Sequence, residues 1–225
     1  EQVLINKVPG TSDKAGVTFL SNNNNKASVT LTAAGTVVDN YVLKFNGAQH
    51  ITFRDITIKA TDVNYGNAVV YETNASYDTI LNCSVVVPVN TSTANNVIGV
   101  FGSSLTGSYN LIKGNEFQNG SKGVFLSGTS GFSKQFTIDS NSFVGTYQYD
   151  IYVANIDNVD ITKNKIERKG LQSTSAYGIY SGNANGVYNI NNNTITINNI
   201  GTTTYGIYAN ANQSSVDSLS STSNN

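Results

Sequence analysis

Seven aromatic residues in the second half of the chain could form one binding surface. They are Phe125, Tyr152, Tyr180 and Tyr208, with Tyr149, Tyr177 and Tyr205 each a few residues upstream. The first four are the middle residues of short triplets such as Ile151-Tyr152-Val153, whose ends point inward if the triplet is a strand. The same outward position earlier in the chain is held by Lys44, Val70 and Gly99.

Such a line of rings is suited to binding a sugar or a protein, because each ring offers a large apolar face and tyrosine adds a polar tip. We predict that the line is exposed to solvent and, as a hypothesis, that it is the contact face for a polysaccharide or a cell-surface glycan. The alternative is structural: stacked rings stabilise a sheet by about 0.2–1 kcal/mol per cross-strand pair.

Paired carboxylates are the second chemistry to test, since polysaccharide-cleaving enzymes use them as acid and base or as calcium ligands. In the repeat described below, no outward column places two acids on neighbouring coils, although Lys113 and Asp139 face each other across one coil. Asp150, Asp157 and Asp160 lie close in sequence, and we interpret them as a solvated turn. We therefore predict no catalytic residue and favour a function without catalysis; a polysaccharide lyase or glycoside hydrolase is the alternative.

The remaining reactive side chains do not suggest a cofactor or a metal site. His50 is the single histidine and stands in a turn, and Cys83 is the single cysteine and fits a buried position. The net charge is −1, so a nucleic-acid partner is not expected. No apolar run is long enough to span a membrane, so membrane insertion is not expected either.

A repeat positions these residues. Its clearest copy, Val159-Asp160-Ile161-Thr162-Lys163-Asn164-Lys165-Ile166, reads apolar, any, apolar, any, any, Asn, any, apolar. Equivalent positions are Ile56, Cys83, Asn115, Asn141, Asn164 and Asn193, and subtraction gives separations of 27, 32, 26, 23 and 29 residues. Short strands at this period without helical patterns predict an all-β, single-stranded parallel β-helix, a solenoid of about seven to eight coils.

The recurring asparagine has a physical reason in such a fold. Stacked coils place equivalent side chains ~4.8 Å apart, so that inward amides can bond to one another. A buried amide without a partner would cost ~1–3 kcal/mol. We therefore predict a buried asparagine ladder rather than a row of exposed turns.

The coils divide the chain into three parts. Residues 1–40 are predicted to form an entry coil with strands near 3–5, 17–20 and 29–31. Residues 41–209 form the repeated coils. Residues 210–225 are a Ser/Asn-rich unfinished coil or frayed tail, and we expect the chain to be part of a longer protein.

The asparagine motif resembles the right-handed parallel β-helix repeat of the pectate-lyase-like superfamily, over residues 41–209. The opening residues, from Glu1 to Thr11 and then Val17-Thr18-Phe19, are similar to the first coils of large secreted bacterial surface proteins. The resemblance implies a right-handed helix and an extracellular or cell-surface location. It does not select an activity, because this fold carries lyases, hydrolases, adhesins and spacers. We expect an adhesive or carbohydrate-contacting module.

Overall fold

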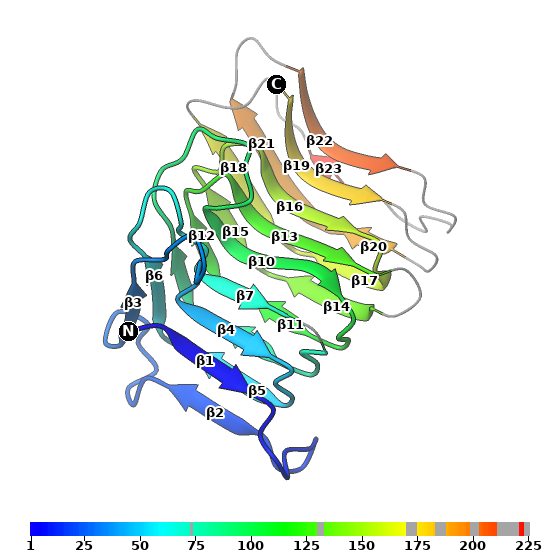
Figure 1. Cartoon of the computed structure of the whole chain (residues 1–225). Coiled ribbons are helices and arrows are strands. Elements are labelled where there is room, and N and C mark those ends of the chain that lie inside the picture. The colour runs from blue at the N-terminus through cyan, green and yellow to red at the C-terminus, as the bar shows by residue number, and fades with distance from the viewer. Residues whose placement is uncertain are drawn as a thin grey trace.

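The structure, a computed structural model, describes residues 1–72, 74–129, 133–169, 175–182, 188–198, 203–210 and 221–222. Three parallel sheets run along its length (Figure 1). The first sheet contains β1 (Val3–Asn6), β4 (Leu43–Asn46), β7 (Val69–Tyr71), β10 (Ile98–Leu105), β13 (Lys122–Gly128), β16 (Tyr149–Ala154), β19 (Ser175–Gly182) and β22 (Thr203–Asn210). The second contains β2 (Val17–Leu20), β5 (Ile51–Arg54), β8 (Thr79–Leu81), β11 (Leu111–Lys113), β14 (Lys134–Asp139), β17 (Asp157–Thr162) and β20 (Tyr188–Asn191). The third contains β3 (Thr30–Ala33), β6 (Thr57–Ala60), β9 (Ser84–Val86), β12 (Glu116–Gln118), β15 (Ser142–Val144), β18 (Lys165–Lys169), β21 (Asn193–Asn198) and β23 (Ser221–Thr222).

Each coil contributes one strand to each sheet in turn, so the chain is a right-handed parallel β-helix, as predicted. The three strands of the predicted entry coil are β1, β2 and β3. The predicted tail, 210–225, lies outside the described residues except for Asn210 and β23. Among the described residues, no helix has the length and apolar character needed to cross a membrane.

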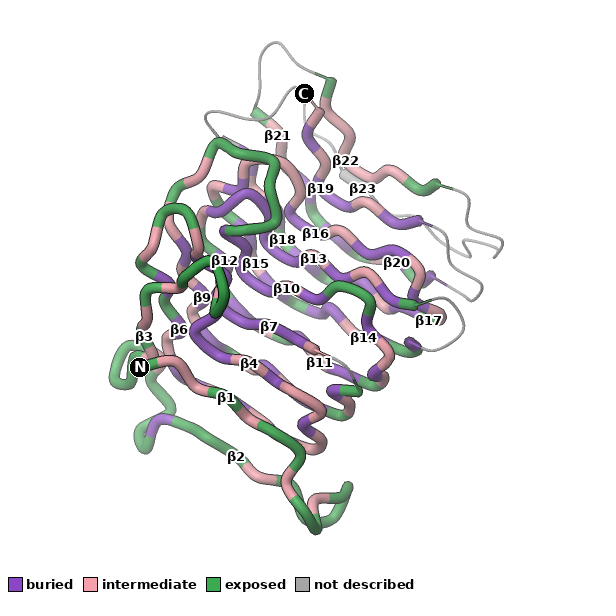
Figure 2. The backbone as a smooth tube through the Cα atoms, in the orientation of Figure 1, coloured by how far each residue is buried: buried purple, intermediate pink, exposed green. Residues whose placement is uncertain are grey.

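The core lies between the three sheets and is built from columns of equivalent side chains. Figure 2 marks the buried residues along the strands in purple. One such column contains Ile80, Ile112, Ile138, Ile161 and Ile190, which pair in register from β8 to β20 and are all fully buried. Branched side chains stacked in this way fill a parallel sheet's inner face without voids. The core therefore continues from coil to coil along the length of the helix.

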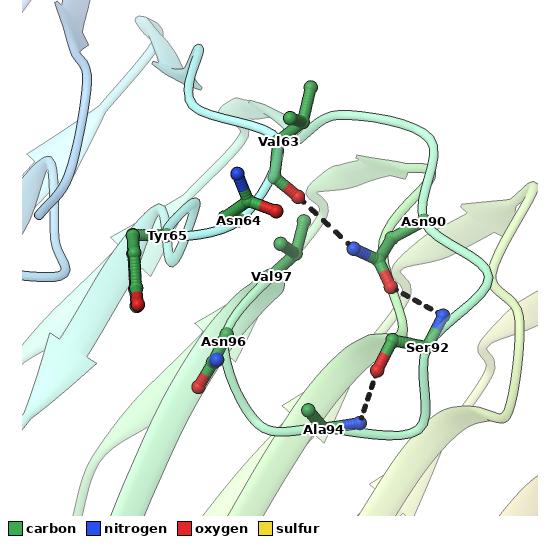
Figure 3. A pocket seen from close by; sticks show the side chains of 8 residues that line it. All are labelled: Val63, Asn64, Tyr65, Asn90, Ser92, Ala94, Asn96 and Val97. Atoms are coloured by element: carbon green, nitrogen blue, oxygen red, sulfur yellow. Dashed lines mark hydrogen bonds between the residues drawn. The ribbon is translucent and has the colours of Figure 1, made fainter. Parts of the chain in front are cut away.

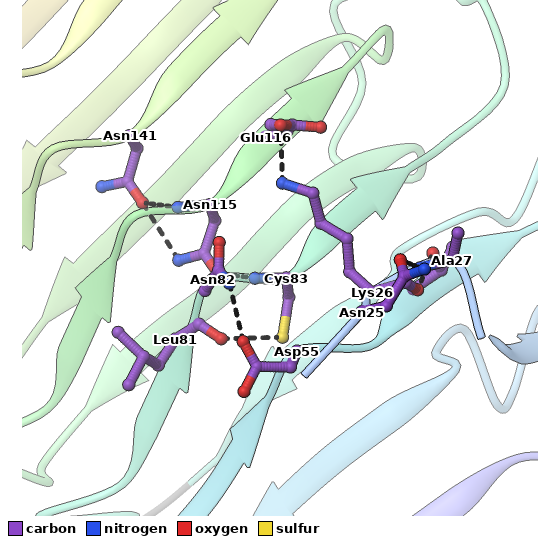
Figure 4. A network of polar contacts seen from close by, with 11 residues as sticks. Asn25, Lys26, Ala27, Asp55, Leu81, Asn82, Cys83, Asn115, Glu116 and Asn141 are labelled. Carbon is purple, nitrogen blue, oxygen red and sulfur yellow. Dashed lines mark hydrogen bonds and ion pairs between the residues drawn. The ribbon is translucent and has the colours of Figure 1, made fainter. Parts of the chain in front are cut away.

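The asparagines form a buried column at the corner between the second and third sheets. Figure 4 shows Asn115 and Asn141 of this column. Asn115 Nδ2 donates to Asn141 Oδ1, Asn141 Nδ2 to Asn164 Oδ1, and Asn164 Nδ2 to Asn193 Oδ1, each at 3.0 Å. Each accepting oxygen also receives the backbone N–H of the preceding asparagine. The backbone N–H of Cys83 continues the series by donating to Asn115 Oδ1 at 2.8 Å.

The residue before each ladder position makes the bend that turns the next side chain inward. These residues are Asp55, Asn82, Gly114, Ser140, Lys163 and Asn192, with φ angles from 49° to 67°. This left-handed conformation is unfavourable for most side chains and is therefore a demanding feature of the turn. The need for this conformation explains why the position is held, in most coils, by a small residue, a residue with a side-chain amide or a flexible residue.

The interpretation of Asp150, Asp157 and Asp160 as a solvated turn is wrong, because Asp157 and Asp160 lie on β17. Asp150, on β16, departs most from it. Its side chain is fully buried, and Oδ2 accepts a hydrogen bond from Arg168 Nε at 2.6 Å. Arg168 is buried too, and its Nη2 donates to the carbonyls of Gln148 and Tyr177. The Asp150 side chain can point inward because its partners on the two neighbouring strands are glycines. Gly123 on β13 and Gly178 on β19 have no side chains that would occupy this space.

Candidate functional site

The outer face of the first sheet carries two neighbouring columns of aromatic rings. The first column consists of Phe101, Phe125, Tyr152, Tyr180 and Tyr208, one from each of the last five strands. Their successive ring centroids are 5.8, 4.5, 4.7 and 5.5 Å apart, and the rings are close to parallel. The strands therefore hold the rings in a continuous stack.

The second column consists of Tyr149, Tyr177 and Tyr205, with centroids 4.7 and 5.1 Å apart. It meets the first column edge to face, for example at 5.2 Å between Tyr149 and Tyr152. Tyr149 and Tyr152 both face outward although they are three residues apart on β16. The two residues between them, Asp150 and Ile151, are both buried, which interrupts the usual alternation of the strand. The eight rings of the two columns are called the aromatic strip below.

The structure brings all seven sequence-predicted site residues into this strip. Every ring is half-buried, since its neighbours cover its faces and leave its outer edge accessible. Burial raises the pKa of Tyr149 to about 12, and the neighbouring tyrosines Tyr177, Tyr152 and Tyr180 add to the effect. The Tyr149 hydroxyl is therefore neutral at physiological pH and can donate a hydrogen bond.

The assignment of Gly99 to the outward column is wrong, and Phe101 is the residue that sequence reasoning missed. Val100 pairs with Val69 and Val124, so the outward place in β10 belongs to Phe101. A side chain at Gly99 would lie 2.5 Å from the Gly123 carbonyl and 2.7 Å from the Phe117 ring. The apolar run around Gly99 fits either phase of a strand, so the sequence alone cannot choose the register.

Lys122 ends the second column and was not anticipated from the sequence. It pairs with Tyr149 in the sheet, and its Nζ lies 5.6 Å from the Phe125 ring centroid. The same ammonium donates to the Thr93 carbonyl and to Asn95 Oδ1, both at 2.7 Å. Burial lowers its pKa to about 8. Lys122 thereby fastens the loop of residues 88–97 beside the strip.

Two cavities are lined in part by residues of that loop. The smaller, about 280 Å³, lies between the loop and residues Val63, Asn64 and Tyr65 (Figure 3). Asn90 spans it, donating from Nδ2 to the Val63 carbonyl at 3.2 Å. The larger, about 490 Å³, opens onto the first sheet at Phe101, the first ring of the strip.

The carboxylates on the described strands do not converge. Among the strand pairs that the structure describes, no two carboxylates are in register. Asp139 lies 2.9 Å from Lys113, as predicted, and Thr162 Oγ1 donates to it at 2.8 Å. Burial alone would raise the pKa of Asp139, but the hydrogen bonds from Lys113 and Thr162 outweigh it and hold the pKa below its ordinary value.

The single histidine and single cysteine are in different environments. His50 stacks on Tyr77 at 4.7 Å, its Nδ1 lies 3.3 Å from Asp13 Oδ1, and Tyr77 in turn stacks on Tyr109 at 4.8 Å. Cys83 is fully buried, with Sγ 3.3 Å from the Leu81 carbonyl, and burial raises its pKa to about 11 (Figure 4). Cys83 therefore behaves as a core residue.

Comparisons with known proteins give a family and a structural neighbour. The family model described as "Periplasmic copper-binding protein (NosD)" matches residues 21–219. The crystal structure of Dettilon tailspike protein (gp208) is similar at 12% sequence identity and a TM-score of 0.30. That similarity covers 92% of this chain and 62% of the tailspike chain, so this chain spans less than two thirds of its neighbour. No curated protein matched the sequence.

Proposed function

We propose, because this chain belongs to the periplasmic copper-binding protein (NosD) family, that it is a β-helix module of the cell envelope whose aromatic strip binds a glycan without cleaving it. The family assignment supports a location outside the cytoplasm. The role of the strip rests on the stacked, half-buried rings of the first sheet.

The strip suits a linear polysaccharide better than a compact ligand. It extends over five strands, and its rings are held by their neighbours before any ligand arrives, so little side-chain entropy is lost on binding. Because neighbouring rings already cover the ring faces, a sugar would pack its C–H groups against the row of outer ring edges. The tyrosine hydroxyls supply hydrogen-bond donors at the same surface, and Tyr180 already accepts a bond from Asn210 Nδ2 at 3.3 Å.

A polysaccharide-cleaving enzyme is the alternative function. It requires two carboxyl groups about 5–9.5 Å apart or a set of carboxylate ligands for calcium. The described strands place Asp139 beside Lys113 and Asp150 in an internal ion pair with Arg168, so neither is available as half of such a pair. This arrangement supports binding over cleavage.

The described residues do not fit the copper that the family's name implies. Copper sites in proteins use cysteine, methionine and histidine ligands. The sequence has no methionine, and its one cysteine is in the core while its one histidine packs on Tyr77. No group of three His, Cys, Asp or Glu side chains that could hold a metal occurs in the described ranges. No step of the proposed function therefore involves copper.

Retention on insoluble polysaccharides tests the proposal. The Tyr180→Ala/Tyr208→Ala variant is expected to lose retention, while Tyr77→Ala/Tyr109→Ala removes two exposed stacked rings from another part of the helix and is expected to keep it. Equal retention of both variants would overturn the binding role of the strip. Release of reducing ends or unsaturated products by the unmodified protein would instead favour the enzymatic alternative.

A further inference from the structure

The larger cavity beside the strip, called the end hollow below, has the size of a ligand site. Its volume of about 490 Å³ falls within the ~300–1,000 Å³ of small-molecule pockets. Its floor is formed by Lys44, Val70 and Phe101, which pair in register on β4, β7 and β10. Because Phe101 is also the first ring of the strip, a chain lying along the strip would lead directly into the end hollow.

The polar groups of the end hollow include both donors and acceptors. Lys44 Nζ lies 3.2 Å from Glu72 Oε1 and 4.3 Å from the Tyr41 ring centroid, so the ammonium is held in place. Glu72 is partly exposed, and its carboxylate can accept further bonds. The Asn95 and Asn96 side chains stand in the wall, and Lys122 fixes Asn95.

Asn67 contributes a polar atom whose hydrogen bonding is incomplete. Its side chain lines the end hollow and is 3% exposed, and its Oδ1 accepts no hydrogen bond from the described residues. Its Nδ2 makes one long bond of 3.4 Å to the Asn95 carbonyl. A buried carbonyl oxygen of this kind is normally paired. Because Asn67 Oδ1 has essentially no accessible surface, a ligand N–H in the end hollow would supply the missing donor once the Asn67 side chain turns toward it.

The opposite wall is apolar and unusually open. Val37 and Val38 line the end hollow and are 73% and 82% exposed. Isolated exposed valines are common, but two adjacent ones in a hollow that also holds Asn67 and Glu72 give the site an apolar side and a hydrogen-bonding side.

We propose that the end hollow binds the terminal residue of the glycan on the strip, and that this residue is an N-acetylated amino sugar. The acetamido group carries both features that the end hollow requires: a methyl group for Val37 and Val38, and an N–H for Asn67 Oδ1. A plain hexose has neither. This inference rests on the proposed function, since the strip supplies the rest of the contact.

Titration calorimetry with matched oligosaccharides tests the inference. The probes are a hexamer of β-1,4-linked N-acetylglucosamine and a hexamer of β-1,4-linked glucose, which share a backbone and differ in the acetamido group. The unmodified protein is expected to bind the first about tenfold more tightly, from one buried methyl group and one added hydrogen bond. The Val37→Ser/Val38→Ser variant, altered only on exposed side chains, should lose that difference, so that the two hexamers bind with similar affinity.

The outcomes separate the two proposals. Tyr180→Ala/Tyr208→Ala should weaken both hexamers alike. If that loss is seen but the unmodified protein does not discriminate between the hexamers, the strip binds glycans and the assignment of the end hollow is wrong. If Tyr180→Ala/Tyr208→Ala leaves both affinities unchanged while the valine variant loses the preference for the N-acetylglucosamine hexamer, the end hollow binds the amino sugar on its own and the proposed role of the strip is wrong. Failure of both hexamers to bind would overturn both proposals.

Discussion

Tyr152 and Tyr180 lie face to face on adjacent strands, with ring centroids 4.7 Å apart and planes only 6° apart. The distance matches the spacing of neighbouring strands, so the backbone ladder sets the ring stack. Tyr149 meets the edge of both Tyr152 and Tyr180, at 5.2 and 5.8 Å. The same arrangement can therefore stabilise the sheet and present a prepared surface, and the two contributions can be measured separately.

Tyr180→Ala is expected to lower the free energy of unfolding by about 2 kcal/mol or more, because it removes two stacked and two edge contacts worth ~0.5–1.5 kcal/mol each. Tyr180→Phe keeps the ring and should change stability by less than about 0.5 kcal/mol. Urea unfolding followed by circular dichroism measures both. An alanine variant as stable as the phenylalanine variant would show that the stack contributes nothing to the fold.

Asn164→Ala tests the asparagine column. It removes the amide that donates to Asn193 Oδ1 and to the Ile138 carbonyl, and it deprives Asn141 of its acceptor. Since each buried group left unpaired costs ~1–3 kcal/mol, the loss of stability should be about 3 kcal/mol or more. Thr194→Ala, an exposed change on the following coil, is the control and should cost under about 0.5 kcal/mol. Similar melting temperatures for the two variants would contradict the role of the column.

The sequence predicts this column well because a repeated asparagine between apolar positions has few other uses. The apolar frame around Asn115, Asn141 and Asn164 also sets the register of the second and third sheets, and the predicted pairing of Lys113 with Asp139 follows from it. A second pattern, the strand triplets such as Ile151-Tyr152-Val153, predicts the seven rings of the first sheet from Phe125 onward.

The first sheet is less predictable where its pattern is ambiguous. The run from Val97 to Val100 allows two registers, and only the close approach of Gly99 to Phe117 decides between them. Asp150 looks like a turn residue because acids are seldom buried, and its partner Arg168 lies on another strand of the same coil. The end hollow combines residues of three strands with loop residues far apart in the sequence, so no local pattern indicates it.

Asp78→Asn tests the effect of pH on stability. Asp78 is buried, its Oδ1 accepts the Ile51 N–H at 2.9 Å, and its Oδ2 has no partner among the described residues. Burial raises its pKa from 3.8 to about 7, partly offset by the Ile51 bond. The unfolded chain therefore releases this proton at lower pH than the folded chain, and the free energy of unfolding should fall between pH ~4 and ~7 and then level off.

Asp78→Asn should remove this fall in the free energy of unfolding between pH ~4 and ~7. A difference of about three in pKa corresponds to roughly 4 kcal/mol as an upper value, so Asp78→Asn should gain stability at pH 8 and little at pH 4. Asn110 already holds the equivalent place on the next coil, with Oδ1 accepting the Asp78 N–H at 2.9 Å, so the amide is expected to fit. Denaturant unfolding at both pH values measures the effect. Equal changes at pH 4 and pH 8 would contradict the assigned titration.

Substitutions in the buried Asp150–Arg168 ion pair test whether the pair stabilises the fold mainly by charge compensation or by filling space. Arg168→Met should cost about 3–5 kcal/mol, because Asp150 is left as a buried carboxylate whose remaining partner is Thr146. Asp150→Gly combined with Arg168→Met removes both charges and restores the glycine that Gly123 and Gly178 provide on adjacent coils. The double variant should therefore be more stable than Arg168→Met alone. It should also lower retention on glycans only modestly, since Arg168 holds the Tyr177 carbonyl while stacking keeps the rings in place. Chemical unfolding gives the free energy of unfolding of the single and double variants. A double variant less stable than Arg168→Met would show that the pair stabilises the fold through packing rather than through charge compensation.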